Sequence, residues 1–183
     1  MIRVTARIGS PDRQPLFANL YVTRRYARIA QMFAMNFSLE LDQDYADIVT
    51  VVIPEWHQRK IIVLPRQRVT YILGSDYYGE TKMATLRMAM HLGRETMNAL
   101  GLHAGSKIIR VNTPRGLEEK GVLIFGLSGT GKTTITTADH GLEAPEGVEV
   151  LQDDINILLP NGSALGSEAN FYIKTDNVTK QQT

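Results

Sequence analysis

The sequence contains no cysteine and no long apolar run, and these absences exclude several classes of protein. Without cysteine, its 183 residues provide no disulfide framework, no thiolate nucleophile and no cysteine-based zinc site. No segment approaches the roughly 20 apolar residues that cross a bilayer, and the first residues lack a stretch of signal-peptide length. We therefore expect a cytoplasmic protein without a membrane partner.

An excess of charge of either sign is also lacking. Lys and Arg number 20 against 19 Asp and Glu, which gives a net charge of +1. This balance produces no field that would hold DNA or an anionic membrane, so nucleic acid is not an expected partner and any anion must be bound locally. The apolar content of 43% and the charged content of 21% are typical of globular proteins.

Hydrophobic periodicity predicts strands and helices in the first hundred residues. Apolar residues at three- and four-residue spacing predict a helix over Tyr21–Met35 and another from Glu80 to Leu100, ended by Gly101. Alternation or Val- and Ile-rich runs predict strands at Ile2–Ile8, Asp47–Ile53, Lys60–Leu64 and Val69–Leu73.

The remaining residues are richer in strand signals. We expect an α/β fold with a mixed sheet, in two partial lobes, 1–100 and 101–183. The cleft between the lobes is the expected place for any bound metal ions. The chain ends soon after a strand-like segment with no closing element, which indicates a fragment. The turn Pro160-Asn161-Gly162 separates the last two predicted strands. The predicted strands are Lys107–Val111, Gly121–Phe125, Val148–Leu158 and Ala169–Thr175.

A glycine-rich loop directly follows the apolar run that ends at Phe125. Residues 126–134, GLSGTGKTT, match the pattern G-x-x-x-x-G-K-[ST] between a strand and a predicted helix. Glycines let successive N–H groups point at phosphate oxygens, Lys132 supplies a cation, and the Thr133 hydroxyl can coordinate Mg²⁺. The alternative is a glycine-rich turn with an exposed lysine. The predicted phosphate-binding residues are Gly126, Leu127, Ser128, Gly129, Thr130, Gly131, Lys132, Thr133 and Thr134.

Three other polar segments are candidates for the same chemistry. Asp153 and Asp154 end a β-rich run about 20 residues after Lys132, and neighbours on a strand point to opposite faces, so one can reach the metal of the loop. A solvated acidic turn is the alternative. Residues 77–82, YYGETK, lie between a strand and a helix but are compatible with an ordinary first turn. His103 has small neighbours, although a single histidine is more often structural.

Together these segments resemble the ATP-dependent phosphoenolpyruvate carboxykinases, in the same order along the chain. Residues 126–134 are similar to the phosphate loop of that family, and residues 152–154 resemble its Gly-Asp-Asp motif. Residues 168–175 resemble its Glu-Gly-Gly-x-Tyr-Ala-Lys-Thr strand, and residues 77–82 resemble its Tyr-x-Gly-Glu-Met-Lys-Lys segment. His103 falls where the family has a metal-binding histidine. The resemblance covers nearly the whole chain.

The resemblance implies a P-loop lobe, part of an N-terminal substrate lobe, and a reaction. Oxaloacetate and ATP would give phosphoenolpyruvate, CO₂ and ADP. Lys132 and Thr133 would serve ATP and Mg²⁺, Tyr77 would lie near oxaloacetate, and Lys174 near the phosphates. The implied catalytic residues are Lys82, Lys132, Asp154 and Lys174, and the implied ligands of Mg²⁺ and of a second ion, Mn²⁺, are Lys82, His103, Thr133, Asp153 and Asp154.

The chain departs from the family pattern in two ways. The family has a second lysine, a metal ligand, where this chain has Met83, and a thioether is a poor ligand for a hard cation. Either Lys82 takes that role or the ion is held differently. The family's enzymes are also much longer, so we expect weak ATP binding, little turnover and association with the remainder of the protein.

Two other functions stay open at this point. One is a kinase and phosphorylase that modifies a serine of a phosphocarrier protein, since that family has a related loop. The other is a non-catalytic module in which a bound nucleotide orders the loop. The sequence does not distinguish ATP from GTP.

Overall fold

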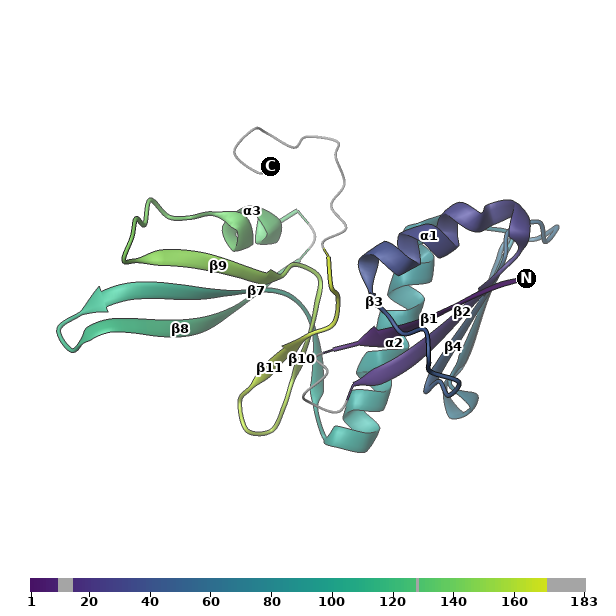
Figure 1. Cartoon of the computed structure of the whole chain (residues 1–183), viewed down its shortest axis with the longest axis horizontal. Helices are drawn as coiled ribbons and strands as arrows, with labels where there is room; N and C mark the ends of the chain where they lie inside the picture. Colours follow the sequence, from purple (N-terminus) through teal and green to yellow (C-terminus); the bar gives the residue numbers. More distant parts are fainter. Residues whose placement is uncertain (10–14, 128, 171–183) are drawn as a thin grey trace. The chain divides into compact units, whose positions relative to one another are not determined.

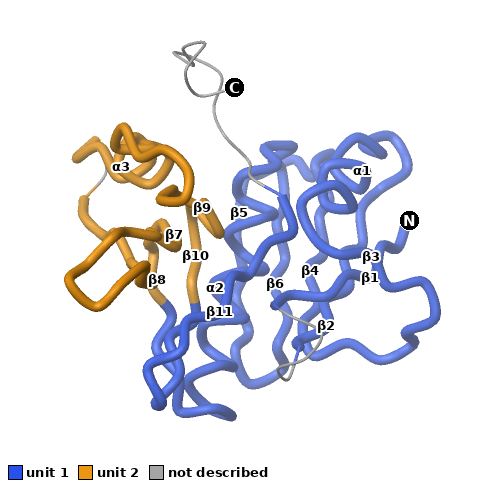
Figure 2. Tube along the Cα trace, turned by 60° about the vertical axis from the view of Figure 1, so that its left-hand side comes forward, with its two compact units in different colours: residues 1–101, 157–170 blue, residues 102–156, 171–183 orange. Residues whose placement is uncertain are grey.

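The computed structural model describes residues 1–9, 15–127 and 129–170. It has an α/β fold with a mixed six-stranded sheet and a second sheet of five strands (Figure 1). The chain forms two compact units (Figure 2). Unit 1 contains Met1–Gly101 and Ile157–Asn170, and the described part of unit 2 is Leu102–Asn156. Residues 157–170, which the sequence placed in the second lobe, thus belong to unit 1.

The sheet of unit 1 mixes parallel and antiparallel pairs. Its order is β3-β1-β2-β4-β6-β5. The strands β2, β4 and β6 are parallel, whereas β1 pairs antiparallel with both β2 and β3, and β5 pairs antiparallel with β6. The strands are β1 (Ile2–Ile8), β2 (Leu16–Val22), β3 (Ser38–Leu39), β4 (Ile48–Ile53), β5 (Lys60–Leu64) and β6 (Val69–Leu73).

Two α-helices pack on this sheet. The helix α1 (Ala27–Asn36) contacts β1 and β2, and α2 (Tyr78–Met97) contacts β4 and β6. On β4, alternate residues are buried, and the Thr50 hydroxyl lies 2.9 Å from the Thr85 hydroxyl of α2. The buried face of β4 therefore faces the helix. Short 3-10 helices occur at Arg24–Tyr26 and Pro65–Gln67.

The two predicted helices are wrong at one end each. Tyr21 and Val22 end the strand β2, which the sequence analysis missed, and α1 begins only at Ala27. β2 carries large apolar residues on both faces, with one face buried and Phe17 and Tyr21 partly buried on the other, so apolar residues do not alternate with polar ones. The second helix ends at Met97 rather than at Gly101, because Asn98 takes the left-handed conformation, with φ of 51°, that commonly stops helices.

Unit 2 is built around one long strand. β7 pairs antiparallel with β8 and with β9, and the order of the sheet is β11-β10-β7-β8. The predicted strands Lys107–Val111 and Gly121–Phe125 are confirmed as parts of longer strands. The elements that follow α2 are β7 (Leu100–Thr113), β8 (Gly116–Phe125), α3 (Lys132–Thr137), β9 (Gly147–Gln152), β10 (Ile155–Leu158) and β11 (Ala164–Gly166). Of these, β11 and the end of β10 belong to unit 1.

Two predicted strands need correction. The expected strand Val148–Leu158 is broken by a bend at residues 153–154, which separates β9 from β10. Of the expected strand Ala169–Thr175, residues 169–170 form a bend, and the rest lies outside the described residues. The predicted turn is confirmed, since the N–H of Gly162 donates to the carbonyl of Leu159 at 2.9 Å.

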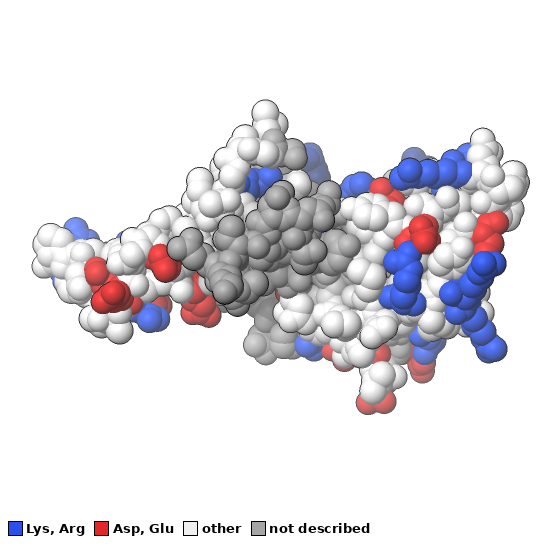
Figure 3. All heavy atoms as spheres, turned by 90° about the horizontal axis from the view of Figure 1, so that it is seen from above, with Lys and Arg blue, Asp and Glu red and all other residues white. Residues whose placement is uncertain are grey.

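The surface shows charges of both signs and no membrane-spanning helix. On the face drawn in Figure 3, Lys and Arg side chains lie among Asp and Glu side chains, in agreement with the net charge of +1. Among the helices of the described residues, none has the length and apolar character needed to cross a membrane. A cytoplasmic location stays a prediction.

Candidate functional site

The glycine-rich loop predicted to bind phosphate begins where β8 ends, in unit 2. Gly129 and Gly131 have φ values of 79° and 86°, in the region that favours glycine. A Cβ atom at either position would meet no other atom within 4 Å, so backbone conformation rather than crowding requires glycine there. The hydroxyl of Thr130 donates to the carbonyl of Leu127 at 2.7 Å and closes the turn. Ser128 lies outside the described residues.

The first turn of α3 joins the loop to one of the predicted acids. α3 begins at Lys132, and both Lys132 and Thr133 are half-buried. The hydroxyl of Thr133 donates to Oδ2 of Asp153 at 3.1 Å. Asp153 directly follows β9, so the loop and the end of that strand bring together two groups separated by 20 residues.

Asp154 takes a different partner from its neighbour. Its Oδ1 lies 3.3 Å from Nε2 of His103 on β7, and the His103 side chain is 57% exposed. The bend at residues 153–154 is held against β7, because the N–H of Ala104 donates to the carbonyl of Asp154 at 2.9 Å. The side chain of Asn156 in turn donates to the carbonyl of Ala104. The two adjacent carboxylates thus lie in two different polar pairs, Thr133–Asp153 and His103–Asp154.

The chemistry of these pairs fits divalent cations. A threonine hydroxyl and a carboxylate supply the oxygen ligands that Mg²⁺ prefers. Carboxylate oxygen also suits Mn²⁺, and imidazole is a ligand of several transition metals. Within the described residues, no group of three or more His, Asp or Glu forms a ready-made metal cluster. Each pair therefore offers two protein ligands. That number is usual for Mg²⁺, which completes its shell with water and nucleotide phosphates.

Lys82 lies in unit 1, in a buried ion pair. Its Nζ is 2.9 Å from Oε1 of Glu168, and the two side chains are 2% and 1% exposed. The same oxygen accepts a hydrogen bond of 2.6 Å from Nδ2 of Asn36, at the end of α1. Asn36 was not predicted as part of this group, because 132 residues separate it from Glu168. Lys174, predicted to be catalytic, lies outside the described residues.

Tyr77 is positioned by the start of α2, also in unit 1. Its side chain is 50% exposed. A Cβ atom on Gly79 would lie 2.5 Å from the hydroxyl end of the Tyr77 ring, so only glycine at position 79 allows the ring to lie there. The N–H of Glu80 donates to the carbonyl of Tyr77 at 3.2 Å. Tyr77 therefore presents a half-exposed phenol at a defined position.

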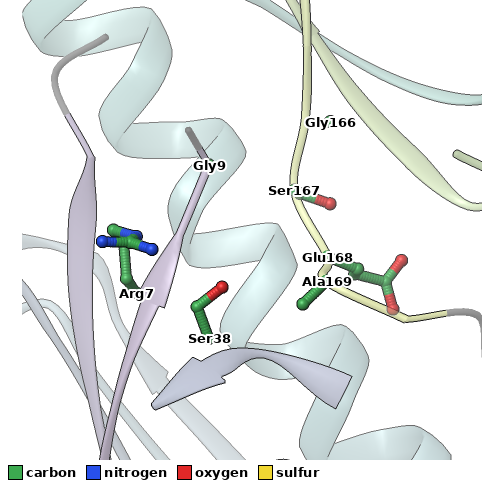
Figure 4. A pocket seen from close by; sticks show the side chains of 7 residues that line it. All are labelled: Arg7, Gly9, Ser38, Gly166, Ser167, Glu168 and Ala169. Carbon is green, nitrogen blue, oxygen red and sulfur yellow. The ribbon is translucent and has the colours of Figure 1, made fainter. Parts of the chain in front are cut away.

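A cavity of about 200 Å³ in unit 1 was not predicted from the sequence (Figure 4). Arg7 and Ser38 line one side, and residues 166–169 line the other. Nη1 of Arg7 pairs with Oε1 of Glu40 at 2.7 Å. In Figure 4 the Glu168 carboxylate points away from Arg7 and Ser38. None of the predicted site residues lines this cavity.

Comparison with known proteins assigns the chain to a family. The phosphoenolpyruvate carboxykinase family profile matches residues 10–183. The chain is 47% identical over 171 residues to phosphoenolpyruvate carboxykinase (ATP) of Aeropyrum pernix, over 93% of its own length. It is 38% identical over 112 residues to the Saccharomyces cerevisiae protein of the same name and 37% identical over 116 residues to that of Zea mays. The chain belongs to the ATP-dependent phosphoenolpyruvate carboxykinase family.

The chain matches only a part of these relatives. It spans 35% of the length of the Aeropyrum pernix protein, 18% of the Saccharomyces cerevisiae protein and 15% of the Zea mays protein. For the yeast and maize proteins, the matched region includes 61% and 63% of this chain.

Proposed function

We propose that this chain carries the nucleotide-phosphate and metal site of an ATP-dependent phosphoenolpyruvate carboxykinase. The complete reaction would convert oxaloacetate and ATP to phosphoenolpyruvate, CO₂ and ADP. The observation that carries this proposal is the contact between Thr133, at the end of the glycine loop, and Asp153, at the end of β9. Family membership adds support and favours this function over a phosphocarrier kinase or a non-catalytic module.

The residues of unit 2 would act mainly by positioning and neutralising charge. Phosphoryl transfer needs the γ-phosphate held in line with its acceptor and its charge balanced. The loop amides and Lys132 would bind the β- and γ-phosphates, and Thr133 with Asp153 would hold Mg²⁺. His103 and Asp154 would hold Mn²⁺. When bound, this ion would supply positive charge to stabilise the enolate that remains after oxaloacetate loses CO₂.

The residues of unit 1 would serve the organic substrate. The phenol of Tyr77 is half-exposed and can donate a hydrogen bond to a carboxylate such as those of oxaloacetate. Lys82 is buried against Glu168, which fixes the position of its Nζ atom. A role for Lys82 in catalysis or metal binding, and one for Lys174, stay part of the proposal.

Binding of MgATP tests the nucleotide part directly. We expect isothermal titration calorimetry to detect binding to the 183-residue chain, weakened at least about tenfold in Lys132→Ala, because a charged phosphate contact contributes more than 1.4 kcal/mol. Lys120→Ala, which removes an exposed lysine of β8, serves as the matched control and should bind normally. No heat of binding, or equal binding by Lys132→Ala, contradicts the proposal.

The proposed reaction of oxaloacetate is tested on a protein longer than these 183 residues. A protein extended to the length of its relatives should exchange labelled CO₂ into oxaloacetate in the presence of nucleotide and Mn²⁺. The same protein with Asp154→Asn should lose most of this exchange, because a neutral amide is a weaker ligand for a divalent cation. Transfer of phosphate to a protein serine instead would favour the phosphocarrier kinase.

A further inference from the structure

Lys107 is a fully buried lysine on the central strand of unit 2. It lies on β7, between Val122 of β8 and Val150 of β9, and is 1% exposed. Lysine is rarely buried to this degree without a partner that satisfies its charge. No carboxylate in the described part of the chain forms an ion pair with it. Burial lowers the pKa of Lys107 from its ordinary value.

The ammonium of Lys107 instead contacts the end of α3 and the residues that follow. It donates to the carbonyl of Ile135 and, at 3.3 Å, to the carbonyl of Ala138. Its Nζ also lies 2.6 Å from Nε2 of His140. An ammonium has three donors, and these three acceptors match them. Free carbonyls at the C-terminal end of a helix are stabilised by such a cation.

A second residue on the same face of β7 brings α3 close. Gly105 and Lys107 are two positions apart, so their side-chain directions coincide. A Cβ atom on Gly105 would lie 2.0 Å from Oγ1 of Thr136, which is fully buried. The helix is therefore in direct contact with the backbone of β7 at Gly105 and hydrogen-bonded to the strand at Lys107.

We propose that Lys107 is a positioning residue that holds α3 against β7 and thereby sets the position of Lys132 and Thr133 in the phosphate site. α3 has only six residues, too few to be stable by itself, so its orientation must come from such contacts. The Thr133–Asp153 hydrogen bond fixes its first turn, and Lys107 fixes its last. This inference rests on the function proposed for the loop.

Hydrogen exchange tests the anchoring without any ligand. The amide of Ile135 donates to the carbonyl of Gly131, and that of Ala138 to the carbonyl of Thr134. In Lys107→Met we expect both amides to exchange about tenfold faster or more, because a charged hydrogen bond is lost. Amides of β2 in unit 1 serve as the internal reference. Unchanged exchange at Ile135 and Ala138 overturns the inference.

MgATP affinity tests the consequence for the site. We expect Lys107→Met to weaken binding about tenfold or more while Lys120→Met leaves it unchanged, and Lys107→Arg, which keeps a cation with N–H donors, to recover part of the loss. Faster exchange with normal affinity in Lys107→Met overturns the positioning role. Failure of the unsubstituted chain to bind MgATP overturns the proposed function itself, and the positioning role with it, whereas the exchange result still decides the anchoring.

Discussion

The two units differ in what holds them together. Unit 1 buries a continuous apolar core, with residues such as Leu20, Ile29 and Phe33 at 0% exposure. In the described part of unit 2, only Ala104 and Ile155 are fully buried apolar residues. Exposed apolar side chains do not distinguish the units, since both have them. Examples are Met35, Leu41 and Val63 in unit 1 and Phe125, Leu127 and Ile135 in unit 2.

This difference places the candidate phosphate site in the unit with the smaller described apolar core. Apolar burial is the main stabilising term in folding, so unit 2 depends more on hydrogen bonds such as those of Lys107 and Thr133. Segments that bind ligands are commonly drawn from the low-stability part of a protein. A bound ligand should therefore stabilise unit 2 far more than unit 1.

The largest effect is expected at the buried ion pair of unit 1. Lys82→Met leaves the Glu168 carboxylate buried without its cation and should lower the free energy of unfolding by about 3–5 kcal/mol. Arg28→Met removes an exposed pair with Asp76, both side chains 55% exposed, and should cost at most about 1 kcal/mol. Urea denaturation measures both. Similar losses in the two variants would refute a special contribution from the buried pair.

Two leucine-to-alanine substitutions, one in each unit, compare how much apolar side chains contribute to the stability of the two units. Leu20→Ala in β2 removes a fully buried side chain and should cost about 2–5 kcal/mol. Leu117→Ala in β8, where the leucine is 46% exposed, should change stability by no more than about 0.5 kcal/mol. Urea denaturation followed by circular dichroism reports both. A large loss in Leu117→Ala would show that unit 2 has more core than its exposure indicates.

Nucleotide should stabilise the units unequally. At about 100 times its dissociation constant, MgATP should raise the stability of unit 2 by about 2.7 kcal/mol. Limited proteolysis can follow this, since cleavage in unit 2 should slow while cleavage in unit 1 does not. Lys132→Ala should abolish the protection. Equal protection of both units would contradict a site confined to residues of unit 2.

The smallest expected effect is at the end of α2. Asn98 has φ of 51°, so Asn98→Ala should cost about 1 kcal/mol, because alanine tolerates the left-handed conformation less well. Asn98→Gly should keep or slightly raise the thermal midpoint, since glycine adopts this conformation without strain. A stable Asn98→Ala variant would show that the end of the helix is fixed by packing instead.

Local signals in the sequence were sufficient for much of the fold and part of the site. The strands Ile2–Ile8, Lys60–Leu64 and Val69–Leu73 were predicted with their observed limits, whereas the strand predicted at Gly121–Phe125 is only the second half of β8. The glycine-rich motif and the acids at the end of a β-rich run predicted that one of Asp153 and Asp154 lies close to the loop, and the structure has Asp153 in contact with Thr133. The metal-binding role of either acid stays a prediction.

Non-local features could not be predicted in the same way. β2 was missed because both its faces carry apolar residues, which removes the alternation that identifies a strand. The contact of Asn36 with Glu168 joins residues 132 positions apart. Lys107 looks like an ordinary strand lysine until its neighbours on α3 are known. Such contacts depend on tertiary packing, which a single sequence does not show.

Hydrogen exchange of the whole chain with and without MgATP tests the central claim most directly. The account predicts slower exchange in the loop at residues 126–134 and at residues 152–154, with little change in β1 and β2 of unit 1. Lys132→Ala should remove this protection. No protection of the loop, or protection found only in unit 1, would contradict the assignment of the phosphate site.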